Sequence, residues 1–452
     1  MNDSNLNFLN SMRCRLVHLV FLAAVLVPSP EACAGNWPQW RGPAYNGSSP
    51  DRDLPVRWSK TENVVCVAPL PGPSGATPAI WEDHVFVSSP DAQKNLNLIC
   101  LDRRDGKVRW QRQVATGDRK EGKNNMATPS PVTDGQSVFV MFGTGDLAAF
   151  DFNGKQLWSR NLARQFGKFA NMFMYGASPL LYNGRLYIQV LQRNPPTYPH
   201  AVDDKPERES FILCLDPQTG KDLWRHVRKT DALAESMETY STPFPYEGRQ
   251  RTEIIVVGGD CVTGHDAATG SELWRCGGLN SKKSEWWRIV TSAVGGDGFV
   301  YACAPKREPL IAIKECGSGI ITDTHVAWRL QEFTPDVCTP LLYEKKMFVL
   351  DGDRQMLTRL NPQTGAKIWQ GHLGVRETFS ASPTGADGKI YCISERGTAV
   401  VLEAGDSFKI LSTISMGEEP CKSSVAVAHQ QLFIRTAQNL YCITADNPAA
   451  PR

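Results

Sequence analysis

Two patterns of apolar and polar positions alternate along most of the chain. In the first, a small residue, a Ser or Thr and often a Pro precede an apolar pair, a turn and an alternating strand. It is clearest in "ATPAIWEDHVFVSS" from Ala76, "ASPLLYNGRLYIQV" from Ala177 and "CTPLLYEKKMFVL" from Cys338. Alternation with a period of two on both sides of a short turn is typical of antiparallel strands. Each copy therefore predicts a strand, a tight turn and a second strand.

The second pattern ends in a tryptophan. It occurs as "LDRRDGKVRW", "FDFNGKQLW", "LDPQTGKDLW", "HDAATGSELW" and "LNPQTGAKIW", which end at Trp110, Trp158, Trp224, Trp274 and Trp369. The Asp or Asn side chain accepts hydrogen bonds from amides two residues further on, and the Gly supplies the positive φ of a tight turn. The large ring then needs a dry surface against which to pack. This pattern predicts a second hairpin whose last strand carries the Trp.

Joined together, the two patterns form a four-stranded unit that recurs about every 52 residues, slightly above the period expected for propeller blades. Such a unit has an apolar face that only a neighbouring unit covers, so the units must stack around a ring. Inner strands are expected near Ala76, Thr128, Ala177, Ser241, Thr291, Cys338, Ser380 and Ser424. Outer strands are expected near Trp58, Trp110, Trp158, Trp224, Trp274, Trp328, Trp369 and Leu411. The predicted fold is all-β, an eight-bladed β-propeller of four-stranded antiparallel blades.

The two ends of the chain each supply part of one blade. The segment Val56–Trp58 has the form of an outer strand without an inner strand before it, and Val425–Thr444 holds three strands without a fourth. We expect Val56–Trp58 to complete the last blade, because this closes the ring and leaves no long free edge. The fifth unit, Ser292–Trp328, matches least well, since its hairpin is longer and lacks the Asp–Gly turn.

These repeats resemble the PQQ-like repeat of the quinoprotein alcohol dehydrogenase-like superfamily. The resemblance rests on "CLDPQTGKDLW", "LNPQTGAKIW" and "ASPLLYNGRLYIQV" and extends over nearly the whole mature chain. It implies the propeller fold without choosing a function. The superfamily includes quinoprotein dehydrogenases, a lipoprotein scaffold of outer-membrane protein assembly and many secreted bacterial proteins. The leader "NWPQWRGPAYNGSSP", Asn36–Pro50, is similar to that of the last group.

Residues 1–34 have the composition of a secretory signal peptide. Arg13 and Arg15 precede the apolar run Leu16–Val27, which is too short to span a bilayer, and a small-x-small cleavage site follows at Ala32–Ala34. We therefore expect an exported protein, periplasmic or extracellular, with one propeller domain over residues 35–452. A lipid anchor at Cys33 is not expected, because a Pro stands three residues before it, where a lipobox requires Leu or a similar residue.

Export makes the cysteines relevant, because disulfides persist in oxidising compartments. Cys100 and Cys214 occupy the same repeat position, inside a strand. Buried free thiols that fill the sheets are therefore the favoured interpretation. Cys261 and Cys276 flank one hairpin and are the candidate for a disulfide.

The usual catalytic motifs do not occur in the sequence. HExxH, GxSxG, the P-loop and GxGxxG are missing, and the eight His are scattered singly, so no catalytic or metal-binding residue is assigned. The composition is that of an ordinary globular protein, with a formal charge of +2 and no basic run, so nucleic acid is not expected as a partner. The resemblance leaves PQQ with Ca²⁺ as an alternative. The calcium-dependent dehydrogenases of the superfamily carry a disulfide between adjacent cysteines, and this chain has no Cys–Cys pair.

The candidate binding site is the mouth of the central channel. In propellers, the loops that lead from an outer strand to the next inner strand surround this mouth, and polar and aromatic groups on them suit a polar ligand or a peptide. A second interpretation is that these side chains only pair with each other and with water. The loops carry Asn124, Asn125, Asn171, Tyr175, Glu238, Tyr240, Trp286, Trp287, Arg288, Arg376, Glu377 and Lys422.

Three functions follow from these observations. The first is an exported, non-catalytic binding or scaffold propeller of the cell envelope, expected to be a monomer, whose partner is an envelope protein, a peptide or a small polar ligand. The second is a PQQ-dependent dehydrogenase of alcohols or sugars. The third is a carbohydrate-binding propeller that uses Trp286 and Trp287. An insertion in the third unit, Gln192–Ser210, is rich in Pro and charge and is expected to be an ordered excursion or a flap.

Overall fold

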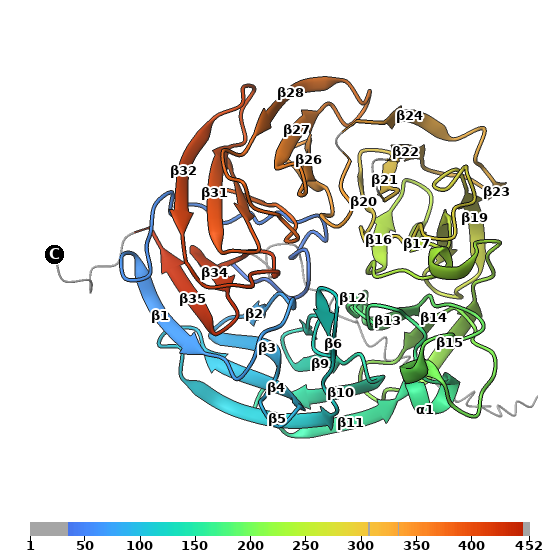
Figure 1. The fold of residues 1–452 in the computed structure, drawn as a ribbon, viewed down its shortest axis with the longest axis horizontal. Helices are drawn as coiled ribbons and strands as arrows, with labels where there is room; N and C mark the ends of the chain where they lie inside the picture. Colours follow the sequence, from blue (N-terminus) through green and yellow to red (C-terminus); the bar gives the residue numbers. More distant parts are fainter. Residues whose placement is uncertain (1–34, 306–307, 333, 446–452) are drawn as a thin grey trace, which may run out of the picture.

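The structure, a computed structural model, describes residues 35–305, 308–332 and 334–445. Eight antiparallel sheets stand around a central axis and form a closed ring (Figure 1). This confirms the predicted eight-bladed β-propeller. The predicted signal peptide and Cys33 lie outside the described residues. Within the described ranges, no helix is long and apolar enough to cross a membrane.

The first four blades follow one another from β2 to β19. Blade one contains β2 (Ala79–Trp81), β3 (His84–Pro90), β4 (Asn95–Asp102) and β5 (Val108–Thr116). Blade two contains β8 (Val132–Thr133), β9 (Ser137–Met141), β10 (Asp146–Asp151) and β11 (Gln156–Asn161). Blade three contains β12 (Leu180–Tyr182), β13 (Arg185–Val190), β14 (Phe211–Leu215) and β15 (Asp222–Val227). Blade four contains β16 (Phe244–Glu247), β17 (Thr252–Gly258), β18 (Cys261–Asp266) and β19 (Glu272–Cys276).

The last four blades complete the ring. Blade five contains β20 (Val294–Gly296), β21 (Phe299–Cys303), β22 (Leu310–Lys314) and β24 (Val326–Leu330). Blade six contains β25 (Leu341–Tyr343), β26 (Lys346–Asp351), β27 (Met356–Leu360) and β28 (Lys367–His372). Blade seven contains β29 (Thr384–Ala386), β30 (Lys389–Ile393), β31 (Thr398–Glu403) and β32 (Ile410–Ser415). Blade eight contains β33 (Ala426–Ala428), β34 (Gln431–Arg435), β35 (Asn439–Thr444) and β1 (Val64–Pro69).

A few elements stand outside the blades. They are the hairpin of β6 (Lys120–Glu121) and β7 (Asn124–Asn125), the short helix α1 (Leu162–Phe166), and the 3₁₀ turns η2 (Pro199–Ala201) and η3 (Ala234–Met237). The strand β23 (Gly319–Ile320) comes from the long hairpin of the fifth unit. It pairs in parallel with β19 and so extends blade four. This explains why the fifth unit fits the repeat least well.

The N-terminal strand closes the ring, but the predicted residues were wrong. The strand that pairs with β35 is β1, and not Val56–Trp58. The predicted segment instead lies against blade seven, where the Tyr391 hydroxyl donates to the Pro55 carbonyl at 3.1 Å. The Trp58 ring packs 6.5 Å from the Tyr391 ring. The segment "VRW" therefore resembles a repeat strand locally, yet it fills the space between two blades.

The tryptophans that end the second sequence pattern pack on the turns of neighbouring blades. The ring of Trp110, on β5, covers the turn of blade two, and its Nε1–H donates to the Phe152 carbonyl at 2.8 Å. A Cβ on Gly154 would lie 2.7 Å from this indole, and a Cβ on Gly220 would lie 2.6 Å from Trp158. Gly154 also has a φ of 78°, in the left-handed region. The turn glycine is therefore required both by its backbone conformation and by the indole above it.

A ring of hydroxyl groups links the inner ends of neighbouring blades. The Ser or Thr of the first sequence pattern accepts a hydrogen bond from the backbone N–H of its counterpart in the preceding blade. This explains the hydroxyl residue in that pattern, because the buried amide finds no partner in its own sheet. With N···O distances of 2.8–3.2 Å, the links run in order from Thr77 through Ser130, Ser178, Thr242, Ser292, Thr339 and Ser382 to Ser424.

This hydroxyl ring is expected to stabilise the fold. Thr242 Oγ1 accepts from the Ser178 N–H at 3.0 Å. Thr242→Val keeps the shape and removes the acceptor, so we expect the free energy of unfolding to fall by about 1–2 kcal/mol. Denaturant titration measures the loss. Thr242→Ser retains the hydroxyl and is the control; an equal loss in both variants would show that the methyl group, and not the hydrogen bond, matters.

Residues 36–50, here called the N-terminal plug, close one end of the channel. Trp37 forms a β-bridge with Ile80 of blade one, and Ser48 forms one with Gly385 of blade seven. The plug therefore crosses the ring and contacts the far ends of the inner strands. The other end of the channel, where the loops enter the inner strands, stays open.

Arg41 anchors the plug in the ring. Its side chain is 2% exposed. The guanidinium donates to the carbonyls of Pro340 and Pro383, on blades six and seven, and to that of Asn46 within the plug, each at 2.9 Å. Burial lowers the pKa of Arg41 to about 9, which leaves it charged at neutral pH.

The cysteines behave as buried thiols. Each of the eleven cysteines in the described part of the chain is free, and all except Cys316 are buried. The candidate disulfide Cys261–Cys276 is not formed, because Cys276 lies opposite Val262 in the ladder of β18 and β19.

Candidate functional site

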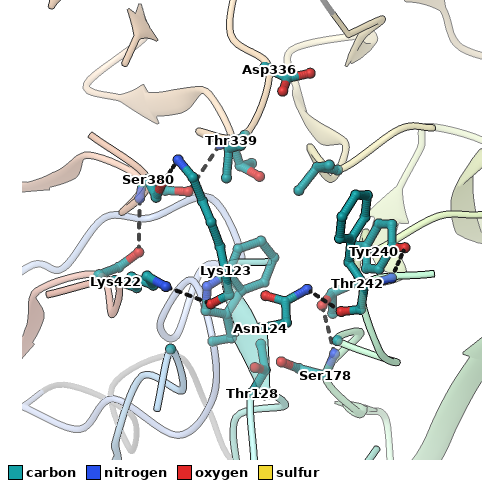
Figure 2. A pocket seen from close by; sticks show the side chains of 18 of the residues that line it. Lys123, Asn124, Thr128, Ser178, Tyr240, Thr242, Asp336, Thr339, Ser380 and Lys422 are labelled. Atoms are coloured by element: carbon teal, nitrogen blue, oxygen red, sulfur yellow. Dashed lines mark hydrogen bonds between the residues drawn. The ribbon is translucent and has the colours of Figure 1, made fainter. Parts of the chain in front are cut away.

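A cavity of about 360 Å³ occupies the channel above the plug (Figure 2). All eight blades contribute to its wall. Trp40 of the plug belongs to the lining, and six members of the hydroxyl ring surround the axis. The ring members in the wall are Ser130, Ser178, Thr242, Thr339, Ser382 and Ser424. The closed end of the cavity is thus lined by hydroxyl groups and one indole.

Two lysines stand on one side of the mouth. The hairpin of β6 and β7 carries Lys123 at its turn, and Lys123 Nζ donates to Glu395 at 2.6 Å and to Ser380 at 3.0 Å. Lys422 Nζ donates to the Lys123 carbonyl at 2.7 Å. Burial lowers the pKa of Lys422, and the charges of Lys120 and Lys123 act in the same direction. The charge of Glu395 acts in the opposite direction, and Lys422 belongs to the cavity wall.

A second charged group of the mouth is built around Arg288. Arg288 stands between Glu235, at 3.3 Å, and Asp336, at 3.6 Å. Its guanidinium lies over the Phe173 ring at 5.1 Å from the centroid. Asp336 lies across the cavity from Asn124 (Figure 2), and the exposed Asp353 is a second carboxylate among the residues that line the cavity. The mouth therefore presents charges of both signs, together with aromatic and amide groups.

The structure brings four of the twelve predicted residues into the cavity wall. They are Asn124, Tyr240, Arg288 and Lys422. Asn124 is fixed by a hydrogen bond from its Nδ2 to the Phe173 carbonyl at 3.0 Å. Tyr240 is 8% exposed and its hydroxyl accepts from the Phe173 N–H at 3.0 Å. The other eight predicted residues do not line the cavity.

Three of those eight are buried behind the wall. Asn171 Nδ2 donates to the Leu191 carbonyl at 2.9 Å, and the Tyr175 hydroxyl donates to the Gln189 carbonyl at 2.9 Å. Glu238 is 0% exposed. These polar side chains satisfy backbone and side-chain partners inside the protein, so a polar residue on a mouth loop is not necessarily a residue of the mouth.

The remaining five also lie outside the cavity wall. Asn125 Nδ2 donates to the Pro73 carbonyl at 2.7 Å, and Trp287 Nε1 donates to the Leu279 carbonyl at 3.2 Å. Trp286 is 56% exposed. Arg376 is exposed, and Glu377 is held by a hydrogen bond from the Ser394 hydroxyl at 2.5 Å. The predicted pair Trp287–Arg288 is therefore split, since only Arg288 belongs to the cavity wall.

Sequence reasoning missed several residues of the wall. The hydroxyl ring was visible as a repeated Ser or Thr before Pro, but that pattern was taken only as the start of a strand. The other missed residues have no repeat signal, because each belongs to a single loop. They are Trp40, Lys123, Phe173, Asp336, Asp353 and Ser380.

Glu238 forms a buried cluster with the insertion Gln192–Ser210. Its carboxylate accepts from Arg193 Nε at 3.0 Å, from the Met172 N–H at 2.8 Å and from the Tyr240 hydroxyl at 3.0 Å. Tyr198 lies over the Arg193 guanidinium at 4.8 Å. The insertion is therefore an ordered excursion that packs behind the cavity wall.

Stability is expected to depend on the protonation of Glu238. Burial raises its pKa to about 7, although the Met172 N–H and the Arg193 charge act against this. The folded protein then binds the proton more tightly than the unfolded chain, so the contribution to stability is full below about pH 4.5 and falls as the pH rises toward 7. In Glu238→Gln this pH dependence disappears. The free energy of unfolding of the wild type should fall relative to the variant by about 3 kcal/mol over that range.

Denaturant titrations at several pH values test this expectation, and the exposed Glu62→Gln is the matched control. Parallel pH profiles for wild type and Glu238→Gln would contradict it.

The cavity wall does not contain the donor set expected for PQQ held through Ca²⁺. Calcium prefers about six to eight oxygen ligands, with several from carboxylates. The wall has the carboxylates of Asp336 and Asp353, and the first is paired with Arg288. In the part of the chain that the structure describes, no three His, Cys, Asp or Glu form a group that could hold a metal. The residues present therefore do not fit this pair of cofactors.

The fold, the repeats and the axial cavity define a β-propeller of the PQQ-like repeat class. Within that class, the chain belongs to the family described as outer membrane protein assembly factor BamB, whose model matches residues 52–193 and 208–449. The break between the two matched ranges falls in the insertion Gln192–Ser210. No curated protein sequence matches the chain.

Solved structures show the same fold at low sequence identity. BamB from Moraxella catarrhalis is 14% identical with a TM-score of 0.60, over 85% of this chain and 98% of that chain. Quinohemoprotein alcohol dehydrogenase from Comamonas testosteroni is 10% identical with a TM-score of 0.64, over 94% and 83%. A europium-containing methanol dehydrogenase is 8% identical with a TM-score of 0.64, over 91% of each chain. At these identities the likeness establishes the fold alone.

Proposed function

We propose that this protein is an exported, non-catalytic binding or scaffold propeller of the cell envelope. A polar ligand, or a peptide segment of an envelope protein, binds in the mouth of the axial cavity. The observation that carries this proposal is the cavity itself, which is closed at one end by the plug and has hydroxyls, an indole and charges of both signs in its wall. Membership of the BamB family supports a partner in the envelope.

The chemistry of the mouth suits a polypeptide. Its hydroxyls and the amide of Asn124 are able to bond backbone groups, while Lys422 and Asp336 offer opposite charges to side chains or chain ends. Arg288 is positioned by Glu235 and Asp336, so it needs no rearrangement before it meets a ligand. Preorganisation of this kind reduces the entropy lost on binding.

Crosslinking in cells tests the proposal. Tagged wild-type protein, Arg288→Ala, Lys422→Ala and the control Arg376→Ala are crosslinked and purified, and the attached proteins are identified by mass spectrometry. We expect one envelope protein to be recovered with the wild type and with Arg376→Ala, and to fall at least about tenfold with the two cavity variants, since each removes a charged contact. Equal recovery with all four proteins would place the partner elsewhere and overturn the cavity proposal.

Titration with PQQ and Ca²⁺ distinguishes the binder from the dehydrogenase. The proposal expects no shift of the melting temperature and no reduction of a dye with alcohols or sugars. A shift that appears together with dye reduction would assign the quinoprotein function instead. The carbohydrate hypothesis stays a prediction, and a glycan array with wild type and Trp286→Ala tests it.

A further inference from the structure

Cys66 and Cys442 lie directly opposite each other on the strands that join the two ends of the chain. Cys66 is on β1, Cys442 is on β35, and they are Cα partners in the antiparallel ladder. Directly opposed residues in such a ladder have Cα atoms about 4.5–5.5 Å apart. This lies inside the range of about 4.4–6.8 Å that a disulfide spans.

The two side chains are also on the same face of the blade. Cys66 Sγ lies 3.8 Å and Cys442 Sγ lies 3.7 Å from the same carbonyl oxygen, that of Arg103. By contrast, Cys261 and Cys276 are offset by one position, because Cys276 is the partner of Val262. The junction of β1 and β35, where the two ends of the chain meet, is here called the seam. The register therefore favours a disulfide at the seam over the disulfide Cys261–Cys276 that the sequence suggested.

The seam lacks the tryptophan contact that is seen elsewhere in the ring. In blades one and two, the outer strand places Trp110 or Trp158 on the turn glycine of the next blade. At the corresponding place on blade eight, the atom next to the turn glycine Gly106 is Cys66 Sγ, 3.2 Å from where a Cβ would stand. A thiol thus takes the place of the large ring at the one point where the ring is closed by strands far apart in sequence.

We propose that Cys66 and Cys442 form a disulfide that covalently closes the propeller ring. The reaction needs an oxidant that itself carries a disulfide, namely a thiol–disulfide oxidoreductase or oxidised glutathione. The Cys66 thiolate attacks one sulfur of that disulfide and expels the other as a thiolate. The Cys442 thiolate then attacks Cys66 Sγ in the mixed disulfide and expels the second sulfur of the oxidant. Two protein thiols are oxidised, the oxidant is reduced to two thiols, and these take up the two protons that the cysteines lose.

The surroundings of the two thiols set the order of attack. Cys66 is 9% exposed, on the outer strand of the blade, whereas Cys442 is 2% exposed. The hydrogen bond between them lowers the pKa of the Cys66 thiol and raises that of Cys442. Cys66 is therefore the attacking thiol and Cys442 the resolving one, because nucleophilic attack requires the thiolate.

Equilibration of the purified, reduced full-length chain in a glutathione redox buffer tests the proposal. After digestion without reductant, mass spectrometry should find the peptide that contains Cys66 linked to the one that contains Cys442. The oxidised protein should melt roughly 5 °C higher than the reduced protein, because the bond constrains a loop of nearly the whole ring. Dithiothreitol should abolish both the link and the shift.

Three variants make the test specific. Cys66→Ser and Cys442→Ser should each lose the linked peptide and the redox-dependent shift, while the control Cys316→Ser keeps both. The result on the wild-type protein decides the proposal even where a variant does not fold. For the decisive measurement, the wild-type protein is equilibrated with excess oxidised glutathione, unfolded and then alkylated. Alkylation of both Cys66 and Cys442 would overturn the proposal.

Discussion

Trp110→Ala is expected to lower the free energy of unfolding by about 3–5 kcal/mol, the range for removal of a large aromatic side chain from a core. The Trp110 side chain is 8% exposed and packs between Phe86 and Phe150, with ring centroids 6.0 and 6.2 Å away. Its Nε1–H also satisfies the Phe152 carbonyl. The variant therefore leaves a void between two blades and an unpaired carbonyl. Denaturant titration measures the loss.

Two further tryptophan variants show where the loss comes from. Trp110→Phe keeps an aromatic ring and removes the indole N–H, so its loss should be smaller, about 1–2 kcal/mol. Trp286, which is 56% exposed, is the matched control, and Trp286→Ala should stay within about 0.5 kcal/mol of the wild type. Similar losses for Trp110→Ala and Trp286→Ala would contradict the contact between blades.

A double-mutant cycle isolates the contact between Trp110 and the turn glycine. In the wild type, Gly154→Ala forces a Cβ to within 2.7 Å of the indole. In Trp110→Ala the indole is gone, and only the cost of a positive φ remains, about 1–2 kcal/mol for a residue other than Gly. The two changes should therefore be less destabilising together than the sum of their separate effects, by about 1 kcal/mol or more. Additive losses would show that the indole does not restrict the turn.

The fold was predictable because its two repeated patterns encode the contacts that build it. The Asp–Gly turn with its Trp specifies the contact between blades, and the Ser or Thr before Pro supplies the ring of hydroxyls. The closing strand was misplaced because the local form of "VRW" matches a repeat, whereas the true strand β1 carries Cys66 where blades one to six carry a Trp. Local similarity could not show that Val56–Trp58 packs beside Tyr391 instead of pairing with β35.

The candidate site was less predictable, because a loop does not reveal in which direction its side chains point. Glu238 and Tyr240 are two residues apart on one loop, yet only Tyr240 belongs to the cavity wall, while Glu238 turns inward to Arg193. Lys123 comes from the small hairpin of β6 and β7, which has no counterpart among the described residues of the other units. Trp40 reaches the cavity only because the plug crosses the ring, a contact between distant segments that no repeat encodes.

Arg41→Met is expected to lower the free energy of unfolding by about 3–5 kcal/mol, or to release the plug from a ring that stays folded. Methionine fills much of the space but donates no hydrogen bond, so the carbonyls of Pro340 and Pro383 lose a charged donor inside the protein. Arg41→Lys keeps the charge without the planar fork that reaches several acceptors at once, so its loss should be intermediate.

Limited proteolysis distinguishes the two outcomes for Arg41→Met. Cleavage confined to residues 36–50 with an unchanged melting temperature for the remainder would show that the plug detaches as a unit, and a lower melting temperature without this cleavage would show that it stabilises the whole ring. The exposed Arg57→Met is the control. If Arg41→Met is as stable as the wild type, and its plug resists proteolysis as well as the wild-type plug does, then Arg41 does not anchor the plug.

Detachment of the plug would also remove Trp40 from the cavity wall and open the second end of the channel. A ligand held against the plug should then bind more weakly.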